Sequence, residues 1–225
     1  MTFSVGDAIK QGWEIFKSRP WFFIGACIIL FIASVVIGLL TEAIDSVLVG
    51  DTVVNPEDPS QGTVIGNLVN FLLSTLVNMG AVAFFLKSYD DLPRASYGDL
   101  WHPQSYLQYL AVTVLFGLMI GLGLILLIVP GLIALVVFFF APFLVIDRLM
   151  GPIEALKASM EITKGHRWTL FGLILAIAGI NILGALALFV GLFVTIPVTT
   201  MAIVYAYRTL SGGAGMIRAP ADATL

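Results

Sequence analysis

The polar side chains best spaced for a binding site form one stripe inside an apolar stretch of the chain. They recur every three or four residues, so in a helix they share about 80° of arc at 100° per residue; they are Asn67, Asn70, Ser74 and Asn78. Amide groups lose their hydrogen-bond partners in hydrocarbon, so the stripe must face protein or water. It could line a cavity for a polar solute or a lipid headgroup. The alternative, which we favour, is hydrogen bonding between helices worth about 0.6 kcal/mol per contact, with Asn181 as a partner.

Ionisable side chains that could carry catalysis or ion coupling are scarce away from the ends of the apolar stretches. Glu42, Lys87 and Asp147 each stand at such an end, whereas proton relays and ion-coupling sites place charges at membrane depth. His102 and His166 have no cluster of metal-ligand residues near them in the sequence. Signatures of serine hydrolases, zinc proteases and phosphate-binding loops are missing. We therefore expect no catalytic, metal-binding or cofactor-binding residues and no enzymatic activity.

The composition is that of a membrane protein. Of 225 residues, 59% are hydrophobic and only 11% are charged, whereas soluble domains are about a quarter charged. The formal net charge of −3 gives no basic footprint for a nucleic acid, so we expect none as a partner. The single cysteine, Cys27, cannot form a disulfide within the chain and is expected to be a small buried apolar residue.

Four long stretches of the chain contain no Asp, Glu, Lys or Arg. About 20 helical residues cross the hydrocarbon layer, so the first two stretches each fit one crossing and the last two each fit a pair of helices joined by a turn. We expect these turns at Val129-Pro130-Gly131 and between Phe189 and Pro197, around Gly191. The sequence thus predicts an all-α polytopic membrane protein, with six transmembrane helices in a bundle. The predicted single domain is 1–210, with spans at about 21–41, 63–87, 105–128, 131–147, 168–188 and 192–209, followed by a flexible cytoplasmic tail at 211–225.

The basic residues set the expected orientation. If the N-terminus is cytoplasmic, all eleven Lys and Arg residues fall on the cytoplasmic side, as the positive-inside rule requires. Five acids fall on the outer side: Glu42, Asp45, Asp51, Glu57 and Asp58. All four tryptophans and all six tyrosines map to the cytoplasmic end, where we expect their rings at headgroup depth. This predicts a multipass protein of the bacterial inner membrane, with both termini in the cytoplasm.

One segment of the chain is repeated. Residues 8–25 align without gaps on residues 155–172, with seven of eighteen positions identical. We interpret each copy as an amphipathic helix, at about 5–18 and 151–164, that lies on the inner leaflet and leads into a span. The expected apolar stripes are Ile9, Trp13 and Phe16 in the first copy and Leu156 and Met160 in the second. The candidate lipid-interface residues are Lys10, Trp13, Lys17, Trp21, Lys157, Lys164, Arg167 and Trp168, and the expected partners are anionic headgroups of the cytoplasmic leaflet.

A weaker echo suggests a third unit. Ser4 precedes Asp7, and Ser96 precedes Asp99, by three residues in the pattern Ser-x-Gly-Asp, which suits the start of a helix. The architecture could therefore be three hairpins, each preceded by a cytoplasmic interfacial helix. We favour duplication for the eighteen-residue match and chance for this shorter echo.

Residues 130–177 resemble a known group of bacterial membrane proteins. The matching elements are Pro130-Gly131, Ile146-Asp147, Glu154-Ala155-Leu156-Lys157-x-Ser159 and Thr163-Lys164-Gly165, with Trp13-x-x-Phe16-Lys17-x-x-Pro20 and Tyr207-Arg208 outside that stretch. They are similar to those of the uncharacterised YciC-like proteins and of the membrane domain of glycerophosphoryl diester phosphodiesterases. The resemblance implies a multipass helical membrane domain, which some relatives fuse to a phosphodiesterase domain. We do not carry phosphodiesterase activity over to this chain.

Two functions from different classes fit these observations. The first is a non-catalytic inner-membrane protein: a scaffold, an accessory subunit or a factor for lipid or envelope homeostasis, with a second copy or another membrane protein as a possible partner. The second is a small transporter or channel for a polar solute or lipid headgroup, lined by the asparagine stripe. The lack of charge at mid-span depth favours the first.

Overall fold

The computed structural model describes residues 4–49, 63–101, 105–187 and 189–212. All regular elements in these ranges are helices. In chain order they are α1 (Val5–Ser18), α2 (Pro20–Val49), α3 (Val64–Asp90), the 3-10 helix η2 (Tyr97–Leu100), α4 (Tyr106–Leu126), α5 (Ile128–Val137), α6 (Ala141–Arg148), α7 (Pro152–Ile162), α8 (Arg167–Leu186) and α9 (Leu192–Leu210).

Six stretches of helix are long and apolar enough to cross a membrane. They are α2, α3, α4, α5 together with α6, α8 and α9. Each contains at least 19 residues, close to the 20 or so that a crossing needs. The predicted all-α architecture with six membrane helices is therefore confirmed.

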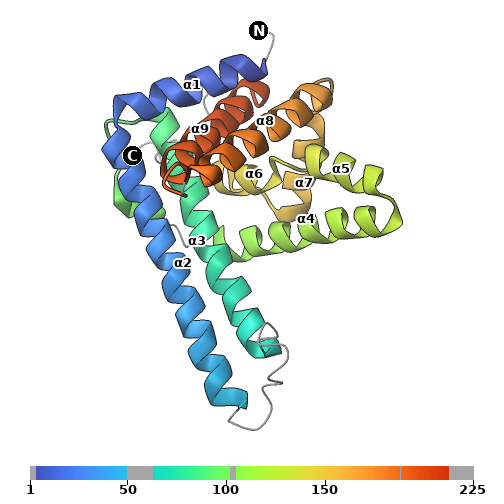
Figure 1. The fold of residues 1–225 in the computed structure, drawn as a ribbon. Helices are drawn as coiled ribbons and strands as arrows, with labels where there is room; N and C mark the ends of the chain where they lie inside the picture. Colours follow the sequence, from blue (N-terminus) through green and yellow to red (C-terminus); the bar gives the residue numbers. More distant parts are fainter. Residues whose placement is uncertain (1–3, 50–62, 102–104, 188, 213–225) are drawn as a thin grey trace, which may run out of the picture.

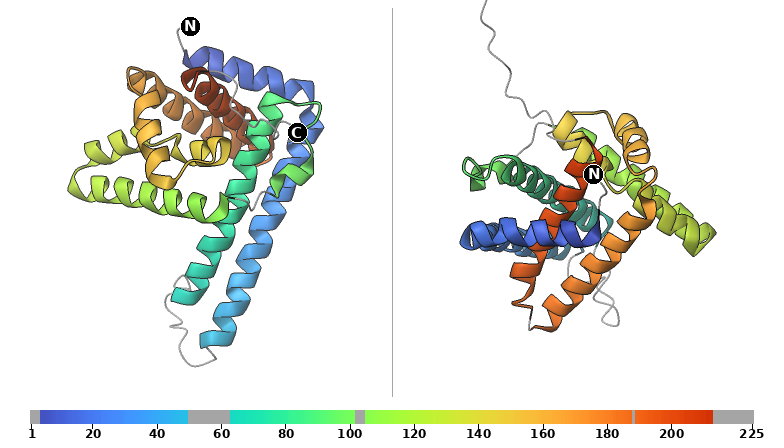
Figure 2. Two further views of the ribbon diagram at one scale, coloured as in Figure 1. Left: turned by 180° about the vertical axis from the view of Figure 1, so that it is seen from behind. Right: turned by 90° about the horizontal axis from the view of Figure 1, so that it is seen from above.

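These helices form three hairpins whose closed ends point in different directions. In Figure 1, α2 and α3 run downwards together, whereas the closed end of α4 and α5 points to the right. The view from above in Figure 2 shows that α8 and α9 run in a third direction. The opposite ends of the hairpins converge near α1 and α6. The structure thus has the three hairpins that the repeats suggested, and they splay apart from a common base.

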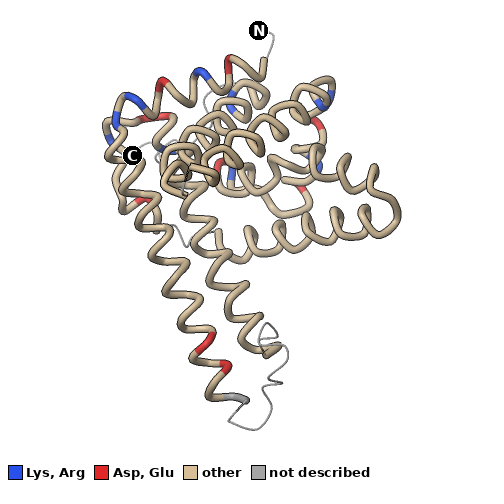
Figure 3. The backbone as a smooth tube through the Cα atoms, viewed as in Figure 1, with Lys and Arg blue, Asp and Glu red and all other residues tan. Residues whose placement is uncertain are grey.

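Charged residues gather at this base. Figure 3 shows Lys and Arg along α1 and around the N-terminal end of α8, whereas the long α2–α3 hairpin carries only acidic residues near its closed end. There, Asp45 Oδ1 accepts hydrogen bonds from the backbone N–H of Thr63, at 3.1 Å, and from the Thr63 hydroxyl. The segregation of cations to one end agrees with the sequence pattern that sets the expected orientation.

Each of the three hairpins follows a short helix that has an acid three residues after its capping residue. The Ser4 hydroxyl accepts from the Asp7 N–H at 3.1 Å, and the Asp99 carboxylate accepts from the Ser96 N–H at 2.8 Å. Glu154 accepts from the Gly151 N–H at 3.4 Å at the start of α7. The acid side chain thus caps the backbone of η2 and α7. In α1 the Ser4 hydroxyl caps it instead and donates to the Asp7 carboxylate at 2.6 Å.

The turn between α4 and α5 lies before the predicted one. Leu127 alone separates the two helices, with φ −167° and ψ 149°, so the prediction at Val129-Pro130-Gly131 was wrong by two or more residues. Pro130 falls in the first turn of α5, where a helix tolerates a residue without an N–H. Gly131 instead allows close packing, because a Cβ on Gly123 would lie 2.8 Å from the Gly131 Cα.

The turn between α8 and α9 also starts earlier than predicted. It spans residues 187–191, and Phe189 takes a left-handed φ of 61° within it. A Cβ on Gly191 would lie 2.6 Å from the Gly184 carbonyl oxygen, so the close return of the chain requires glycine there. Pro197 lies inside α9 and not at its start.

The fourth span, predicted as one helix over 131–147, is broken. Helix α5 ends at Val137 and α6 begins at Ala141, because the ring of Pro142 cannot continue a helix through the carbonyl of Phe138. Helix α7 supplies the missing hydrogen bonds. The Ser159 hydroxyl donates to the Val137 carbonyl at 2.9 Å and accepts from the Phe140 N–H at 3.2 Å.

Replacing Ser159 with alanine should therefore lower the free energy of unfolding by about 1–3 kcal/mol, since it leaves the buried Phe140 N–H without an acceptor. Ser34→Ala is the control, because the exposed Ser34 hydroxyl bonds only to the Leu30 carbonyl of its own helix and should change stability by less than about 0.5 kcal/mol. Denaturant titration of both variants in detergent measures the difference. Equal, small effects would show that α7 does not support the break.

Helix α1 buries a face of small residues against α9. Ala8 is fully buried and Phe16 is 5% exposed, and a Cβ on Gly12 would lie 2.9 Å from the Ala202 backbone nitrogen of α9. Trp13 of the expected apolar stripe is instead 44% exposed. The buried face of this helix thus contacts protein, and it takes Phe16 of the expected stripe with it while Trp13 stays exposed. Contact of the helix with the inner leaflet stays a prediction.

Helix α7 is likewise packed against protein. Ala155, Leu156 and Ser159 are buried, and the helix contacts α4 and α6. Met160, the second member of the expected stripe, is 41% exposed. The predicted helix at 151–164 is observed at Pro152–Ile162, and it closes the break in the fourth span as well as leading into α8.

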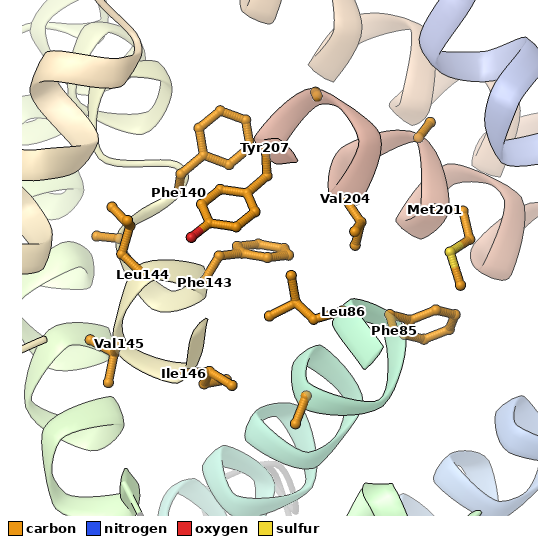
Figure 4. Packing of buried hydrophobic residues seen from close by; sticks show 14 of the residues in the cluster. Phe85, Leu86, Phe140, Phe143, Leu144, Val145, Ile146, Met201, Val204 and Tyr207 are labelled. Carbon is orange, nitrogen blue, oxygen red and sulfur yellow. The ribbon is translucent and has the colours of Figure 1, made fainter. Parts of the chain in front are cut away.

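The core lies where α3, α6 and α9 meet at the base of the hairpins. Figure 4 shows aromatic and aliphatic side chains from these three helices packed together, with the ring of Tyr207 between Phe140 and Phe143. Both ring centroids lie 5.7 Å from that of Tyr207. Leu86 and Val204 complete the contact between α3 and α9 and are fully buried. Packing is therefore concentrated at the charged end of the molecule.

Candidate functional site

A buried ionic cluster joins the three hairpins inside this core. The guanidinium of Arg208 binds the Asp90 carboxylate through Nε at 2.9 Å and Nη2 at 2.5 Å. Its Nη1 donates to Asp147 Oδ2 at 2.6 Å, and the Tyr207 hydroxyl donates to the same oxygen at 2.7 Å. Arg208 is 3% exposed and Asp147 2%. We call these four residues the Arg208 cluster.

Each hairpin contributes a charge to the Arg208 cluster. Asp90 ends α3, Asp147 lies in α6 at the end of the second hairpin, and Arg208 lies in the last turn of α9. Arginine suits this position because its planar fork binds two carboxylates and stays charged. With two carboxylates around one cation the cluster carries a formal charge of −1, and Asp147 Oδ1 has no hydrogen-bond partner among the described residues. Arg208 therefore holds the ends of α3, α6 and α9 together through two carboxylates.

The sequence reasoning missed the Arg208 cluster. Asp147 was interpreted as a boundary charge and Tyr207 as a ring at headgroup depth, yet both are buried. Asp90 and Arg208 are 118 residues apart in the chain, and Asp147 and Arg208 are 61 apart, so no local spacing pairs them. The available signal was that all three charges end a predicted span at the same membrane face.

The aromatic residues divide into two groups. The four tryptophans are exposed, from 44% for Trp13 to 87% for Trp168. In contrast, Tyr109 and Tyr207 are buried at 5% and 0%, so the expectation that every tyrosine sits at headgroup depth was wrong. The four tryptophans, and Tyr97 at 43% exposed, are placed as an aromatic belt requires.

The asparagine stripe lies on α3, and its hydrogen bonds are within the first hairpin. Asn70 Nδ2 donates to the Thr41 hydroxyl of α2 at 3.3 Å, and the Ser74 hydroxyl donates to Asn70 Oδ1 at 3.2 Å. Asn78 donates to the Ser74 carbonyl of its own helix at 2.8 Å. Asn67 and Asn78 are exposed. The stripe therefore joins α2 to α3 at its middle, with an exposed amide on either side.

The sequence predicted that Asn181 pairs with this stripe, but the structure places it elsewhere. Its Nδ2 donates to the Thr199 hydroxyl of α9 at 3.3 Å, because α8 packs against α9 in the third hairpin. Asn181 Oδ1 and Thr195 Oγ1 are buried without a hydrogen-bond partner among the described residues. Amides thus join neighbouring helices separately in the first and third hairpins.

The candidate lipid-interface residues lie on the surface near the base of the hairpins. All eight are exposed: Lys10, Trp13, Lys17, Trp21, Lys157, Lys164, Arg167 and Trp168. Lys17 Nζ lies 6.0 Å from the Trp13 ring centroid, at the limit of a cation–π contact. This places cations beside aromatic rings, as at a membrane surface.

The two copies of the repeat treat their last cation differently. In the first copy, Arg19 donates to the Leu92 carbonyl at 2.8 Å and lies 4.5 Å from the Phe22 ring centroid. In the second copy, Arg167 at the start of α8 has no ion pair or hydrogen bond to the described residues. Only the second copy therefore presents a guanidinium that a ligand could bind.

An ion pair fixes η2 on the end of α3. Lys87 Nζ lies 2.5 Å from Asp99 Oδ1, and Ser96 supplies the N–H bond described above. Burial raises the pKa of the Asp99 carboxyl, but the hydrogen bonds from Lys87 and Ser96 outweigh it. The pKa therefore lies below its ordinary value of 3.8.

This lowered pKa predicts a pH dependence of stability. A carboxyl whose pKa is lower in the folded state stabilises the fold above its unfolded pKa and loses that contribution as the pH falls through the folded pKa. Asp99→Asn should therefore reduce the free energy of unfolding at pH 7, and its difference from the unchanged protein should shrink below about pH 4. Unfolding titrations at pH 7 and pH 3 measure this. A difference that is the same at both values would contradict the assignment.

Within the described ranges, no group of three or more His, Cys, Asp or Glu residues is placed to hold a metal ion. The predicted outer acids Asp51, Glu57 and Asp58, His102, and residues 213–225 of the predicted tail lie outside the described residues. In the Arg208 cluster, two carboxylates share one buried guanidinium.

Comparison with known proteins gives relatives without an assigned activity. Residues 123–213 match the model of a family described as a protein of unknown function, DUF975, and this range contains the stretch that carries the resemblance noted above. Uncharacterised proteins of Mycobacterium bovis and Mycobacterium tuberculosis are 28% identical over 227 residues, covering 94% of this chain and 70% of theirs. No solved structure matches. The resemblance to YciC-like proteins stays a prediction, and the chain is similar to uncharacterised proteins over nearly its whole length.

Proposed function

We propose that this chain is a non-catalytic integral protein of the bacterial inner membrane that acts as a lipid-contacting scaffold or accessory subunit. The observation that carries the proposal is the outward display of apolar surface by three splayed hairpins. Exposed side chains occur on each of them, including Phe31 at 60%, Ile125 at 84% and Leu186 at 76%. Such surface is stable only against lipid or another membrane protein.

The use of the buried charges supports a structural role. Catalytic and ion-coupling sites need groups that can exchange protons or ligands. In the Arg208 cluster, both oxygens of Asp90 and one of Asp147 are bound by a guanidinium, which keeps its proton. The cluster therefore fits a device that fixes three hairpins better than one that moves a proton or an ion.

The distribution of cations supports the proposed membrane and orientation. Lys10, Lys17 and Lys157 are exposed on the short helices at the base, and Lys164 is exposed in the turn after α7. Each cation near an anionic leaflet contributes about 1 kcal/mol of attraction. We propose that this base lies at the cytoplasmic leaflet, with both termini in the cytoplasm and anionic lipids as partners.

The test is lipid preference after charge reversal. The protein is purified in nanodiscs of mixed phosphatidylglycerol and phosphatidylcholine, and the lipids retained after transfer to detergent are quantified. Replacing Lys10, Lys17, Lys157 and Lys164 with Glu should abolish the enrichment of phosphatidylglycerol. Glu14→Gln with Glu161→Gln changes exposed acids on the same helices and should keep it. Unchanged enrichment in the reversed variant would overturn the proposed lipid contact.

The same preparation tests the transport alternative. Single cysteines at Asn67, Ser74 and Asn78 are introduced after Cys27→Ala and exposed to a water-soluble thiol reagent. The scaffold proposal predicts that Ser74, which is half-buried within the first hairpin, stays protected. Rapid labelling of all three positions would indicate a hydrated path along α3 and would favour a transporter.

A further inference from the structure

A groove runs between the second and third hairpins. It has a volume of about 410 Å³ and lies between one face of α5 and the start of α8. The α5 residues recur with helical spacing over seven positions, which gives a length of about 10 Å at 1.5 Å per residue. The lining residues are Val129, Leu132, Ile133, Val136, Arg167, Trp168 and Phe171.

The groove is lined by apolar side chains along its length and by one cationic side chain, that of Arg167. Val136 is 5% exposed and closes one end of the α5 face, whereas Ile133 is 52% exposed. Arg167 is the one charged residue among those lining it, and the described residues offer it no counter-ion. An apolar channel beside an uncompensated guanidinium matches a molecule with an apolar tail and an anionic head.

The lining of the groove suits a lipid chain. Apart from Arg167, its walls are apolar side chains of α5 together with Trp168 and Phe171 of α8. An acyl chain needs no hydrogen-bond partner along such a wall. In the first copy of the repeat, Pro20 occupies the position that aligns with Arg167, and the neighbouring Arg19 is bound to the Leu92 carbonyl.

We propose that this groove binds one acyl chain of an anionic phospholipid, whose phosphate is bound by Arg167 and whose chain lies along α5. The proposal rests on the lipid contact proposed above and assigns it a single specific site. Trp168 stands beside Arg167 at the mouth of the groove and is 87% exposed, where a ring contacts the headgroup region.

Photo-crosslinking with a lipid probe tests the site. The full chain is reconstituted in nanodiscs that contain phosphatidylglycerol with a diazirine on one acyl chain, and cross-linked peptides are mapped by mass spectrometry. We expect cross-links to be enriched on α5 around Leu132 and Ile133 relative to equally exposed residues such as Ile32 and Leu175. Labelling spread evenly over these positions would overturn the proposal.

Two variants test the headgroup contact and the acyl-chain contact separately. Arg167→Gln should lower cross-linking in the groove about five-fold, the loss expected for one cation near an anionic head. Arg94→Gln, an exposed cation that pairs with Asp91 away from the groove, should leave it unchanged. Ile133→Trp should abolish the cross-links on α5, and Ile182→Trp, an exposed site on α8 outside the groove, should not. Circular dichroism checks that each variant folds.

The outcomes distinguish this site from the broader proposal. Phosphatidylglycerol could remain enriched and sensitive to the lysine reversals while Arg167→Gln changes no cross-link. In that case the proposed lipid site in the groove is wrong, and the proposed lipid-contacting scaffold stands. If a photo-reactive phosphatidylcholine labels the groove equally and independently of Arg167, the groove holds any chain and its proposed headgroup specificity is wrong. Cross-links from α5 to a second copy of the chain would assign the groove to an oligomer and would also overturn the lipid site.

Discussion

Replacing Arg208 with methionine is expected to lower the free energy of unfolding by about 3–5 kcal/mol. The guanidinium is buried between the carboxylates of Asp90 and Asp147, and its removal leaves two acids close together without a counter-charge. Methionine keeps most of the side-chain volume, so the loss reports the charge and not a cavity. Titration with a denaturing detergent, followed by circular dichroism, measures the change.

Arg148→Met is the matched control. Arg148 is also at the base of the hairpins, but it is exposed and its Nη2 donates only to the Ser211 carbonyl at 2.9 Å. We expect a change of less than about 1 kcal/mol. Similar losses for both variants would contradict the role of the Arg208 cluster as the junction of three hairpins.

Replacing Gly12 with leucine is expected to lower the free energy of unfolding by about 3 kcal/mol, at the upper end of the cost of overpacking. A Cβ at this position meets backbone atoms of Val198 and Ala202 in α9, and backbone cannot move aside as a flexible side chain can. Helix α1 must therefore separate from α9. Thermal unfolding monitored by tryptophan fluorescence measures the effect, because Trp13 is one residue away.

Gly6→Leu in the same helix is its control. No atom lies within 4 Å of a Cβ built on Gly6, so the substitution removes a glycine from the first turn of α1 without a clash. It should leave stability unchanged or raise it slightly. If Gly12→Leu were equally harmless, α1 would lie on lipid as the sequence predicted, and not on α9.

The parts of the fold that could be predicted depend on local composition. The uncharged runs give the spans, because hydrocarbon excludes charge whatever the tertiary arrangement. The bounds of α1 at Val5–Ser18 match the predicted 5–18, since Ser4 and the alternation of charged and apolar groups mark its start and its period. The Ser-x-Gly-Asp echo, interpreted as chance, caps a helix at Ser4 and again at Ser96.

The parts that could not be predicted depend on contacts between distant segments. The free carbonyl of Val137 at the break is bound by Ser159 and Thr163, 22 and 26 residues later in the chain, and no periodicity shows this. The Arg208 cluster joins residues up to 118 positions apart. Hydrophobic patterning also cannot tell a helix face on protein from one on lipid, which is why the buried faces of α1 and α7 were assigned to the membrane.

The splayed arrangement of the hairpins explains why the contacts at their base matter for the proposed function. Hairpins that meet mainly at a charged base leave most of their apolar flanks free for lipid or for a partner, and the α5–α8 groove is one such flank. Beyond the base, the rings of Phe31 in α2 and Phe193 in α9 are in contact. The stability of the assembly then rests on the base, where most large buried side chains lie. Substitutions at the closed ends of the hairpins should be tolerated better than substitutions at the base.

The most direct test of this account is the accessibility of single cysteines from each side of the membrane, in the Cys27→Ala background. Three hairpins sharing one base place Lys10 and Lys157 on one side and the exposed closed-end residues Val47, Leu127 and Val190 on the other. The account predicts that an impermeant reagent labels the first group only in inside-out vesicles and the second group only in right-side-out vesicles. Labelling of Leu127 and Lys157 from the same side would contradict it.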